Sequence, residues 1–199
     1  MALSKQAKVL NSRQISMVRS HLRSRRNGLR NDLIFLLSVK AGLRAKEISQ
    51  LSWIHVLGSD GMVGDVLGLT DIASKGRSGR EIPIHKDIKI GLSELLKVRL
   101  SRRREFDPSE RVISTERSAG TTPQVIVNFF ARLYSDLGLV GCSSHSGRRT
   151  FITDCSRRIS SVGGSLRDIQ QLAGHSSLQT TQRYIEGSTE SKTRLIGLI

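Results

Sequence analysis

The sequence contains little cysteine and no long apolar run. Its two cysteines, Cys142 and Cys155, lack the spacing that zinc ligands or a disulfide framework require. The apolar stretch at residues 33–39 is far shorter than the roughly 18 residues of a membrane-spanning helix, and the N-terminus carries no apolar signal core. These absences argue against a structural zinc site, a disulfide-stabilised secreted protein and an integral membrane protein. They favour a reducing, cytoplasmic compartment.

Acidic residues are scarce relative to basic ones. Seventeen Asp and Glu stand against 32 Lys and Arg, which gives a net charge of +15. Such an excess repels itself in a compact protein unless a polyanion offsets it, so nucleic acid is the first partner suggested and an anionic membrane surface the second. The scattered carboxylates form no pair of the kind that holds two Mg²⁺ ions in nucleases. We therefore expect no metal and no other cofactor.

The chain has the length of one ordinary domain, and no internal repeat or Pro/Gly-rich linker divides it. We expect a single domain over residues 1–199. Apolar residues recur mostly at helical spacing, whereas glycines and β-branched residues dominate residues 58–84. The predicted fold class is mainly α with a small antiparallel β-sheet (α+β). Helices are expected at 13–26, with Ser12 as the cap and Asn27-Gly28 as the stop, and at 29–39, ending at Ala41-Gly42. Further helices are expected at 44–53, 86–104, 124–137, 177–185 and 189–198 and after Ser143 or Ser144. Another follows Ser165, with a Ser165–Asp168 capping box and a stop at Gly174. Strands are expected at 66–72, 81–84 and 112–114.

Side chains suited to proton transfer and nucleophilic attack gather in the last third of the chain. His145 and Arg148 are three residues apart and would share a helix face, and histidine exchanges protons near neutral pH. His175 and Tyr184 follow. Tyr184 lies in a polar segment, whereas Tyr134 belongs to an apolar helical stripe and is expected in the core.

Two upstream residues complete a set that could act on a phosphodiester. Arginine can hold two non-bridging phosphate oxygens at once, which makes Arg44 a candidate beside Arg148. Lys75 lies at the tip of the expected hairpin. A phenol needs nearby cations and a base to become a nucleophile. Plainer alternatives are a solvated helix face for His145, a packing ring for Tyr184, a surface side chain for Arg44 and a simple phosphate contact for Lys75.

The order of these motifs resembles the catalytic domain of the tyrosine recombinases, also called the phage integrase family. The resemblance runs from about residue 10 to 187. The matching stretches are Ala41-Gly-Leu-Arg44-Ala-Lys-Glu47-Ile-Ser-Gln-Leu51, the hairpin with Lys75 that ends in Arg80-Glu-Ile-Pro-Ile84, His145-Ser-Gly-Arg148-Arg-Thr-Phe151, and Leu172-Ala-Gly-His175 through Arg183-Tyr184.

The resemblance implies a mechanism that cuts and rejoins DNA without metal. Tyr184 would attack the scissile phosphate and leave a 3′-phosphotyrosyl link and a free 5′-hydroxyl. The two arginines and His175 would stabilise the transition state, while Lys75 would protonate the leaving oxygen and His145 would assist the tyrosine. Glu47 would support Arg44 from behind. The implied catalytic residues are Arg44, Lys75, His145, Arg148, His175 and Tyr184.

The sequence departs from the family pattern in two ways. Gly147 and Arg149 stand where the family often has Leu and His, so we expect looser packing behind His145. Few residues precede the first expected helix, so the helical core-binding domain that usually comes first is expected to be lacking. The chain is then either a piece of a longer recombinase or a reduced one.

Double-stranded DNA is the expected partner, and basic side chains cluster near the first two helices and after residue 96. The predicted DNA contacts are Arg23, Arg25, Arg26, Lys75, Arg77 and Arg149, and the wider clusters add Arg19, Arg30, Lys97, Arg99 and residues 102–104. The apolar residues 195–199 are expected either to dock on a neighbouring copy in a homo-oligomer or to pack on their own body. The alternatives to a recombinase are a type IB topoisomerase-like enzyme and a catalytically silent DNA-binding accessory protein. The expected location is the cytoplasm, in association with the nucleoid.

Overall fold

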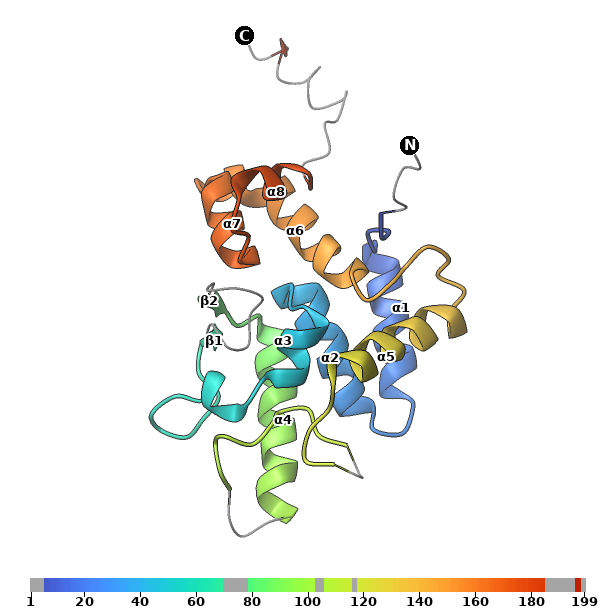
Figure 1. Ribbon diagram of the computed structural model, residues 1–199, viewed down its shortest axis with the longest axis vertical. Coiled ribbons are helices and arrows are strands. Elements are labelled where there is room, and N and C mark those ends of the chain that lie inside the picture. The colour runs from blue at the N-terminus through green and yellow to red at the C-terminus, as the bar shows by residue number, and fades with distance from the viewer. Residues whose placement is uncertain (1–5, 70–78, 103–105, 116–117, 185–195, 198–199) are drawn as a thin grey trace.

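The computed structural model describes residues 6–69, 79–102, 106–115, 118–184 and 196–197, and its architecture is helical with one two-stranded sheet (Figure 1). The strands β1 (Val66–Leu69) and β2 (Arg80–Pro83) pair antiparallel, with Leu69 opposite Arg80. This agrees with the predicted fold class. The α-helices are α1 (Ser12–Arg23), α2 (Gly28–Ala41), α3 (Ala45–Gln50), α4 (Lys86–Arg102), α5 (Pro123–Asp136), α6 (Ser146–Arg158), α7 (Leu166–Ala173) and α8 (Leu178–Gln182), and the 3-10 helices are η1 (Trp53–His55) and η2 (Ile159–Val162).

Helix α2 forms the centre of the main core. Residues 32–39 are all buried, because α1, α4 and α6 pack around the helix on different sides. A helix that is apolar all round is stable only when it is enclosed in this way. The polar residues in the run are Ser38 and Asp32, and the Asp32 carboxylate accepts hydrogen bonds from Arg19 Nε at 3.1 Å and Arg23 Nε at 2.7 Å. A buried carboxylate thus holds two arginines of the predicted DNA-binding cluster.

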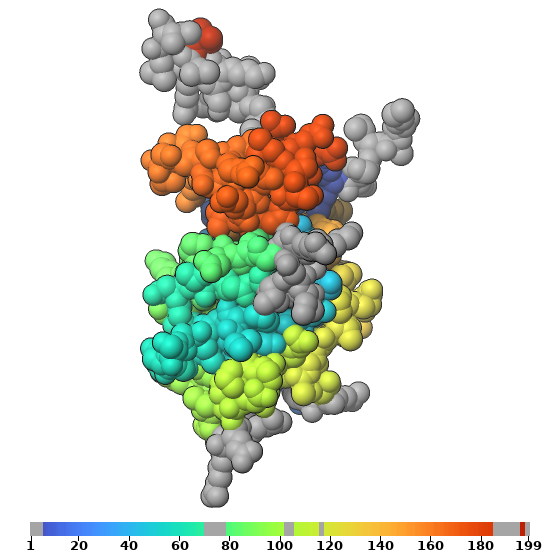
Figure 2. Space-filling view, turned by 60° about the vertical axis from the view of Figure 1, so that its left-hand side comes forward, coloured from blue at the N-terminus to red at the C-terminus, as the bar shows by residue number. Residues whose placement is uncertain are grey.

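Helices α6, α7 and α8 form a second, smaller layer at one end of the molecule. Ile152, Ile169 and Ala173 make a core of their own, against which Phe151 and Tyr184 pack. In the space-filling view this layer, in orange, lies against the teal and green residues of the strand region (Figure 2). The sheet, α2 and α3 therefore face the C-terminal helices, and the site described below lies where these parts meet.

Gly147 joins the two layers, and the prediction of looser packing at this position was wrong. A Cβ added to Gly147 would lie 2.3 Å from Ser38 Oγ and 2.9 Å from Ser38 Cβ. The absence of a side chain therefore lets α6 approach α2 closely.

Several predicted boundaries need correction. Asn11, not Ser12, caps α1, because its side chain accepts from the Gln14 N–H and Gln14 returns a bond in a capping box. Helix α1 ends at Arg23, and Asn27, with φ of 59°, precedes α2 instead of ending α1.

The segments around Trp53 and Val112 also differ from expectation. Helix α3 ends at Gln50, and Trp53 begins η1. Residues 112–114 form no strand. Instead, Ser52 and Arg111 make an isolated bridge, and the Val112 N–H donates to the Leu51 carbonyl at 2.8 Å. Within the described ranges, no helix is both long and apolar enough to cross a membrane.

Candidate active site

Arg44 occupies the turn between α2 and α3 and is held by Glu47. Gly42, with φ of 65°, ends α2 in the left-handed conformation, and Arg44 then caps α3 in extended conformation. The Arg44 N–H donates to Glu47 Oε2 at 2.7 Å, and Arg44 Nη1 donates to Glu47 Oε1 at 2.9 Å. The Arg44 side chain remains 26% exposed, so its guanidinium is fixed by the protein and still accessible to a ligand.

Arg148 projects from α6 beneath this turn. Its Nη1 donates to the Gly42 carbonyl at 2.6 Å and its Nη2 to the Ala173 carbonyl at 2.5 Å. Burial and the nearby charge of Arg44 lower the pKa of Arg148 to about 9. The guanidinium is still charged at neutral pH, but it is in an environment that an added anion would stabilise.

His175 follows α7, which begins with the predicted Ser165–Asp168 capping box and ends at Gly174 with φ of 60°. The imidazole is 9% exposed, and its Nδ1 lies 3.0 Å from Thr181 Oγ1. Burial and the charges of Arg148, Arg44 and Arg80 lower the pKa of His175 to about 4. His175 is therefore neutral at physiological pH. If Thr181 donates to Nδ1, the proton lies on Nε2, where it can be donated to a ligand.

Tyr184 stands beside His175. The two rings stack with centroids 5.5 Å apart and an interplanar angle of 23°, and the Arg149 guanidinium carbon lies 5.9 Å from the centre of the Tyr184 ring. Arg149 also donates to Gln6 Oε1 in the segment that precedes α1. Tyr184 also packs against the small core, as the packing alternative expects, and its role as the nucleophile stays a prediction.

These side chains line one pocket of about 490 Å³. Residues from four parts of the sequence contribute to it, and the part at Gln6 and Ala7 was not among the predicted site residues. The lining residues are Gln6, Ala7, Arg44, Ser143, His145, Arg148, Arg149, His175, Thr180, Arg183 and Tyr184.

His145 lines this pocket from a different position than expected. It is the N-cap residue of α6 and does not lie within the helix, so the prediction of a Ser143 or Ser144 cap was wrong. The Ser143 N–H donates instead to Ser146 Oγ at 3.0 Å, and the His145 N–H donates to Ser143 Oγ at 3.3 Å. The His145 side chain is exposed, which leaves it accessible to a ligand in the pocket.

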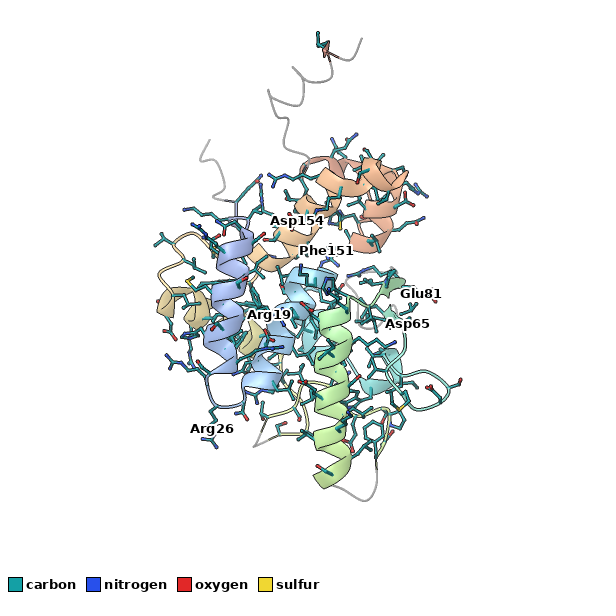
Figure 3. All side chains as sticks on the ribbon, turned by 180° about the vertical axis from the view of Figure 1, so that it is seen from behind. Arg19, Arg26, Asp65, Glu81, Phe151 and Asp154 are labelled. Atoms are coloured by element: carbon teal, nitrogen blue, oxygen red, sulfur yellow. The ribbon has the colours of Figure 1, made fainter. Side chains whose placement is uncertain are left out.

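The remaining predicted residues lie elsewhere or outside the described part. Lys75 and Arg77 fall in residues 70–78, outside the described residues. Arg25 and Arg26 are exposed in the turn between α1 and α2, and Figure 3 places Arg26 at the end of the molecule opposite α6–α8. Arg23 is half-exposed and bonded to Asp32. Their contacts with DNA stay predictions.

Sequence reasoning missed a role for Arg80 and Thr181. Arg80 donates from Nη1 and Nη2 to the two Glu47 oxygens at 2.9 and 3.0 Å, and from Nε to the Leu172 carbonyl at 3.0 Å. A signal for Arg80 existed, because it alternates with Ile82 on the inward face of β2. No local pattern pairs Thr181 with His175.

Glu47 is the buried counter-charge of the site. It is fully buried and accepts four hydrogen bonds from Arg44 and Arg80. Burial alone would raise the pKa of Glu47, but the hydrogen bonds and charge of Arg80 and Arg44 lower it below its usual value. The site therefore holds three arginines against one carboxylate and carries a net positive charge suited to a phosphate. In the described ranges, no three His, Cys, Asp or Glu side chains gather as metal ligands would.

A family model matches residues 8–191, and its description is the phage integrase family. The chain belongs to the phage integrase family. Among its relatives in this family are tyrosine recombinase XerC of Mesorhizobium japonicum, 30% identical over 156 residues, and tyrosine recombinase XerA of Thermococcus onnurineus, 32% identical over 180 residues. These matches cover 78% and 85% of the chain but 46% and 58% of the relatives, so the chain spans about half the length of the curated relatives it matches.

Solved structures show the same fold at lower identity. The crystal structure of XerA recombinase matches with a TM-score of 0.73 at 20% identity, over 100% of this chain and 65% of that one. XerH site-specific recombinase bound to its difH substrate matches with a TM-score of 0.72 at 18% identity, over 98% of this chain and 55% of that one. The phage integrase chain thus has the fold of a tyrosine recombinase catalytic domain.

Proposed function

We propose that this chain is the catalytic domain of a site-specific DNA recombinase that cuts and rejoins DNA through a 3′-phosphotyrosyl intermediate at Tyr184, without metal. The observation that carries the proposal is the single pocket in which Arg44, Arg148, His175 and Tyr184 meet. Guanidinium groups and a neutral imidazole can hold the non-bridging oxygens of a phosphodiester, and a phenol beside them can attack the phosphorus. Family membership supports this assignment of roles.

Each side chain then has a defined step. Arg44 and Arg148 bind the two non-bridging oxygens and stabilise the added charge of the transition state. His175 donates from Nε2 to one of these oxygens. The phenol proton of Tyr184 leaves with the help of His145, which faces the pocket from the start of α6. The bond from phosphorus to the 5′-oxygen breaks, and Lys75 protonates that oxygen, a role that rests on the sequence resemblance.

We further propose that double-stranded DNA is the substrate, that residues 1–199 act as one domain, and that copies assemble on DNA in the cytoplasm, at the nucleoid. Recombination joins two duplexes, so more than one active site must act. Removal of residues 190–199 should weaken assembly on DNA and leave the binding of one copy to one site intact, as gel-shift titration would show. Unchanged assembly would refute the docking role of this segment.

A nicked suicide substrate tests the chemistry directly. Duplexes from the DNA that flanks the gene, each with a nick near a candidate crossover site, trap the covalent intermediate because the cleaved end diffuses away. We expect an adduct that digests to a peptide containing Tyr184, and Tyr184→Phe should abolish it while DNA binding persists.

Tyr134→Phe is the matched control for this experiment. The Tyr134 hydroxyl is buried and has no hydrogen-bond partner among the described residues, so its loss should change neither folding nor adduct formation. Adducts that persist in Tyr184→Phe would refute Tyr184 as the nucleophile.

A further inference from the structure

Arg80 is the charged residue beside the pocket that the mechanism leaves without a role. All three of its guanidinium nitrogens donate to the protein, two to Glu47 on α3 and one to the Leu172 carbonyl on α7. Its side chain is 5% exposed, compared with 26% for Arg44. Arg80 does not line the pocket that holds Arg44, Arg148 and Tyr184, and its donors are already bound to Glu47 and Leu172, so any part it plays there acts through its neighbours.

The backbone that leads to His175 lies directly against Arg80. A Cβ on Gly174 would stand 2.6 Å from Arg80 Nη1 and 3.0 Å from its Cδ. Only a glycine leaves room for the guanidinium there, and its positive φ turns the chain from α7 toward the pocket. The position of Arg80 thus determines how closely the Gly174–His175 turn can approach α3.

Arg80 also limits how strongly the Glu47 carboxylate attracts Arg44. The Glu47 carboxylate bonds Arg80 with both oxygens and shares the same oxygens with Arg44. Without Arg80, the full charge of this buried carboxylate would fall on Arg44 alone, and the Arg44 guanidinium would be drawn toward Glu47 and away from a ligand. Arg80 therefore leaves Arg44 free to bind a phosphate.

Arg80 also connects the two-stranded sheet to α3 and α7. Arg80 is the first residue of β2 and pairs with Leu69 at the end of β1, so its side chain fastens the base of the hairpin to α3 and α7. Lys75 belongs to the segment between these two strands.

We propose that Arg80 is a positioning residue that aligns Arg44 and His175 for cleavage, by joining the start of β2 to Glu47 and to the end of α7. This inference rests on the proposed function. Misplacement of reacting groups by about 1 Å can slow an enzyme by about a hundredfold. Arg80 should thus affect the rate of the chemical step more than the affinity for DNA.

Arg80→Lys tests this, because it keeps a charge beside Glu47 but loses the planar fork that reaches two segments. The wild-type protein and the variant are compared for adduct formation on the nicked substrate, for DNA affinity and for thermal unfolding. We expect the rate of adduct formation to fall by about ten- to a hundredfold, with DNA affinity and folding at the assay temperature retained. Arg111→Lys is the control, because Arg111 likewise donates to an acceptor at the end of α3, the Gln50 carbonyl, yet does not line the pocket.

The outcomes separate this inference from the proposed function. A wild-type protein that forms no Tyr184 adduct overturns both. If the wild-type protein forms the adduct and Arg80→Lys forms it at a rate within about twofold of the wild-type rate, the role of Arg80 alone is overturned. The same holds if Arg111→Lys loses as much rate as Arg80→Lys. If Arg80→Lys does not fold, the pair Glu47→Gln with Arg80→Met removes both charges and takes its place. This pair should show the same loss of rate, and a rate near that of the wild type overturns the proposal.

Discussion

At the residue scale, burial determines the protonation state of His175. The histidine is enclosed between the small core and three arginines, which lowers its pKa to about 4 from 6.5 in the unfolded chain. Between these two values the unfolded chain binds a proton that the folded chain does not, so stability falls as the pH falls through this window. Above pH 6.5 both states are neutral at this position and the loss is absent.

We therefore expect His175→Gln to flatten the pH dependence of stability. The wild-type free energy of unfolding should drop between pH 6.5 and pH 4 by up to about 3 kcal/mol more than that of the variant. Urea titrations across this range measure the difference. His55 and His85 also have lowered pKa values because of burial and nearby cations, but they act equally in both proteins. His145→Gln, at an exposed position, should follow the wild-type curve, and identical slopes for His175→Gln would contradict the prediction.

Arg149 offers a second prediction, because its contact with Tyr184 competes with its predicted contact with DNA. A cation near an aromatic ring at an exposed site contributes about 0.5–1 kcal/mol, and a fixed positive charge favours the negative charge that develops on the phenol oxygen. Arg149→Gln should thus slow adduct formation by about two- to fivefold. DNA affinity should barely change.

Arg158→Gln, which removes the same charge from an exposed site on α6, provides the control. A direct phosphate contact would give another pattern. The affinity of Arg149→Gln for DNA would then fall, and the salt dependence of binding would weaken by about one unit.

At the scale of helices and strands, close approach of α2 and α6 fixes one wall of the pocket. Gly147 and Gly91 both lie in helices, but an added Cβ at Gly147 meets Ser38 at 2.3 Å, whereas at Gly91 it meets Leu33 at an ordinary 3.4 Å. Gly147→Ala should therefore destabilise the protein by about 1–3 kcal/mol through overpacking. Gly91→Ala should stabilise it by about 0.5–1 kcal/mol, because alanine favours a helix.

Ser38→Ala separates this clash from other effects of the new side chain. The Ser38 hydroxyl is buried and makes no hydrogen bond within the part of the chain that the structure describes, so its removal should cost little stability. In the double variant with Gly147→Ala, part of the lost stability should return, because the nearest clashing atom is gone. Thermal unfolding of the wild-type protein, the two single variants and the double variant measures this. A double variant as unstable as Gly147→Ala would show that the clash is not the cause.

Local signals in the sequence predicted where most helices begin and end, but they did not predict the contacts between distant segments. The Ser165–Asp168 capping box and the stops at Gly42 and Gly174 involve only neighbouring residues, so the sequence contains all the information they need. The expected strand at 112–114 depended on a partner that the sequence did not specify. The role of Arg80 was not predicted for the same reason, because its hydrogen-bond acceptors lie 33 and 92 residues away in the sequence. The grouping of Arg44, Arg148, His175 and Tyr184 was predictable only because family motifs record such distant contacts.

At the scale of the whole molecule, buried acids reduce the positive charge available for DNA. Asp32 and Glu47 bind four arginines between them, so not all of the 32 Lys and Arg side chains are available to contact phosphates. Affinity for DNA should still fall by orders of magnitude from low to moderately high salt, because each released phosphate contact contributes about 0.9 to the slope of log affinity against log salt. A flat response would refute a DNA-binding surface.

The slope of log affinity against log salt, compared between variants, also shows which end of the molecule binds DNA. Arg183 lines the pocket with Tyr184, whereas Arg26 lies at the opposite end of the molecule (Figure 3). If DNA covers the pocket end alone, Arg183→Gln should reduce the slope by about one and Arg26→Gln should leave it unchanged. This result would follow from the proposed function, in which the pocket holds the scissile phosphate, and it would rule out the predicted DNA contact of Arg26 at the other end of the molecule. Equal reductions in both variants would instead mean that DNA follows the protein as far as the turn between α1 and α2, as the sequence-based assignment of Arg26 requires.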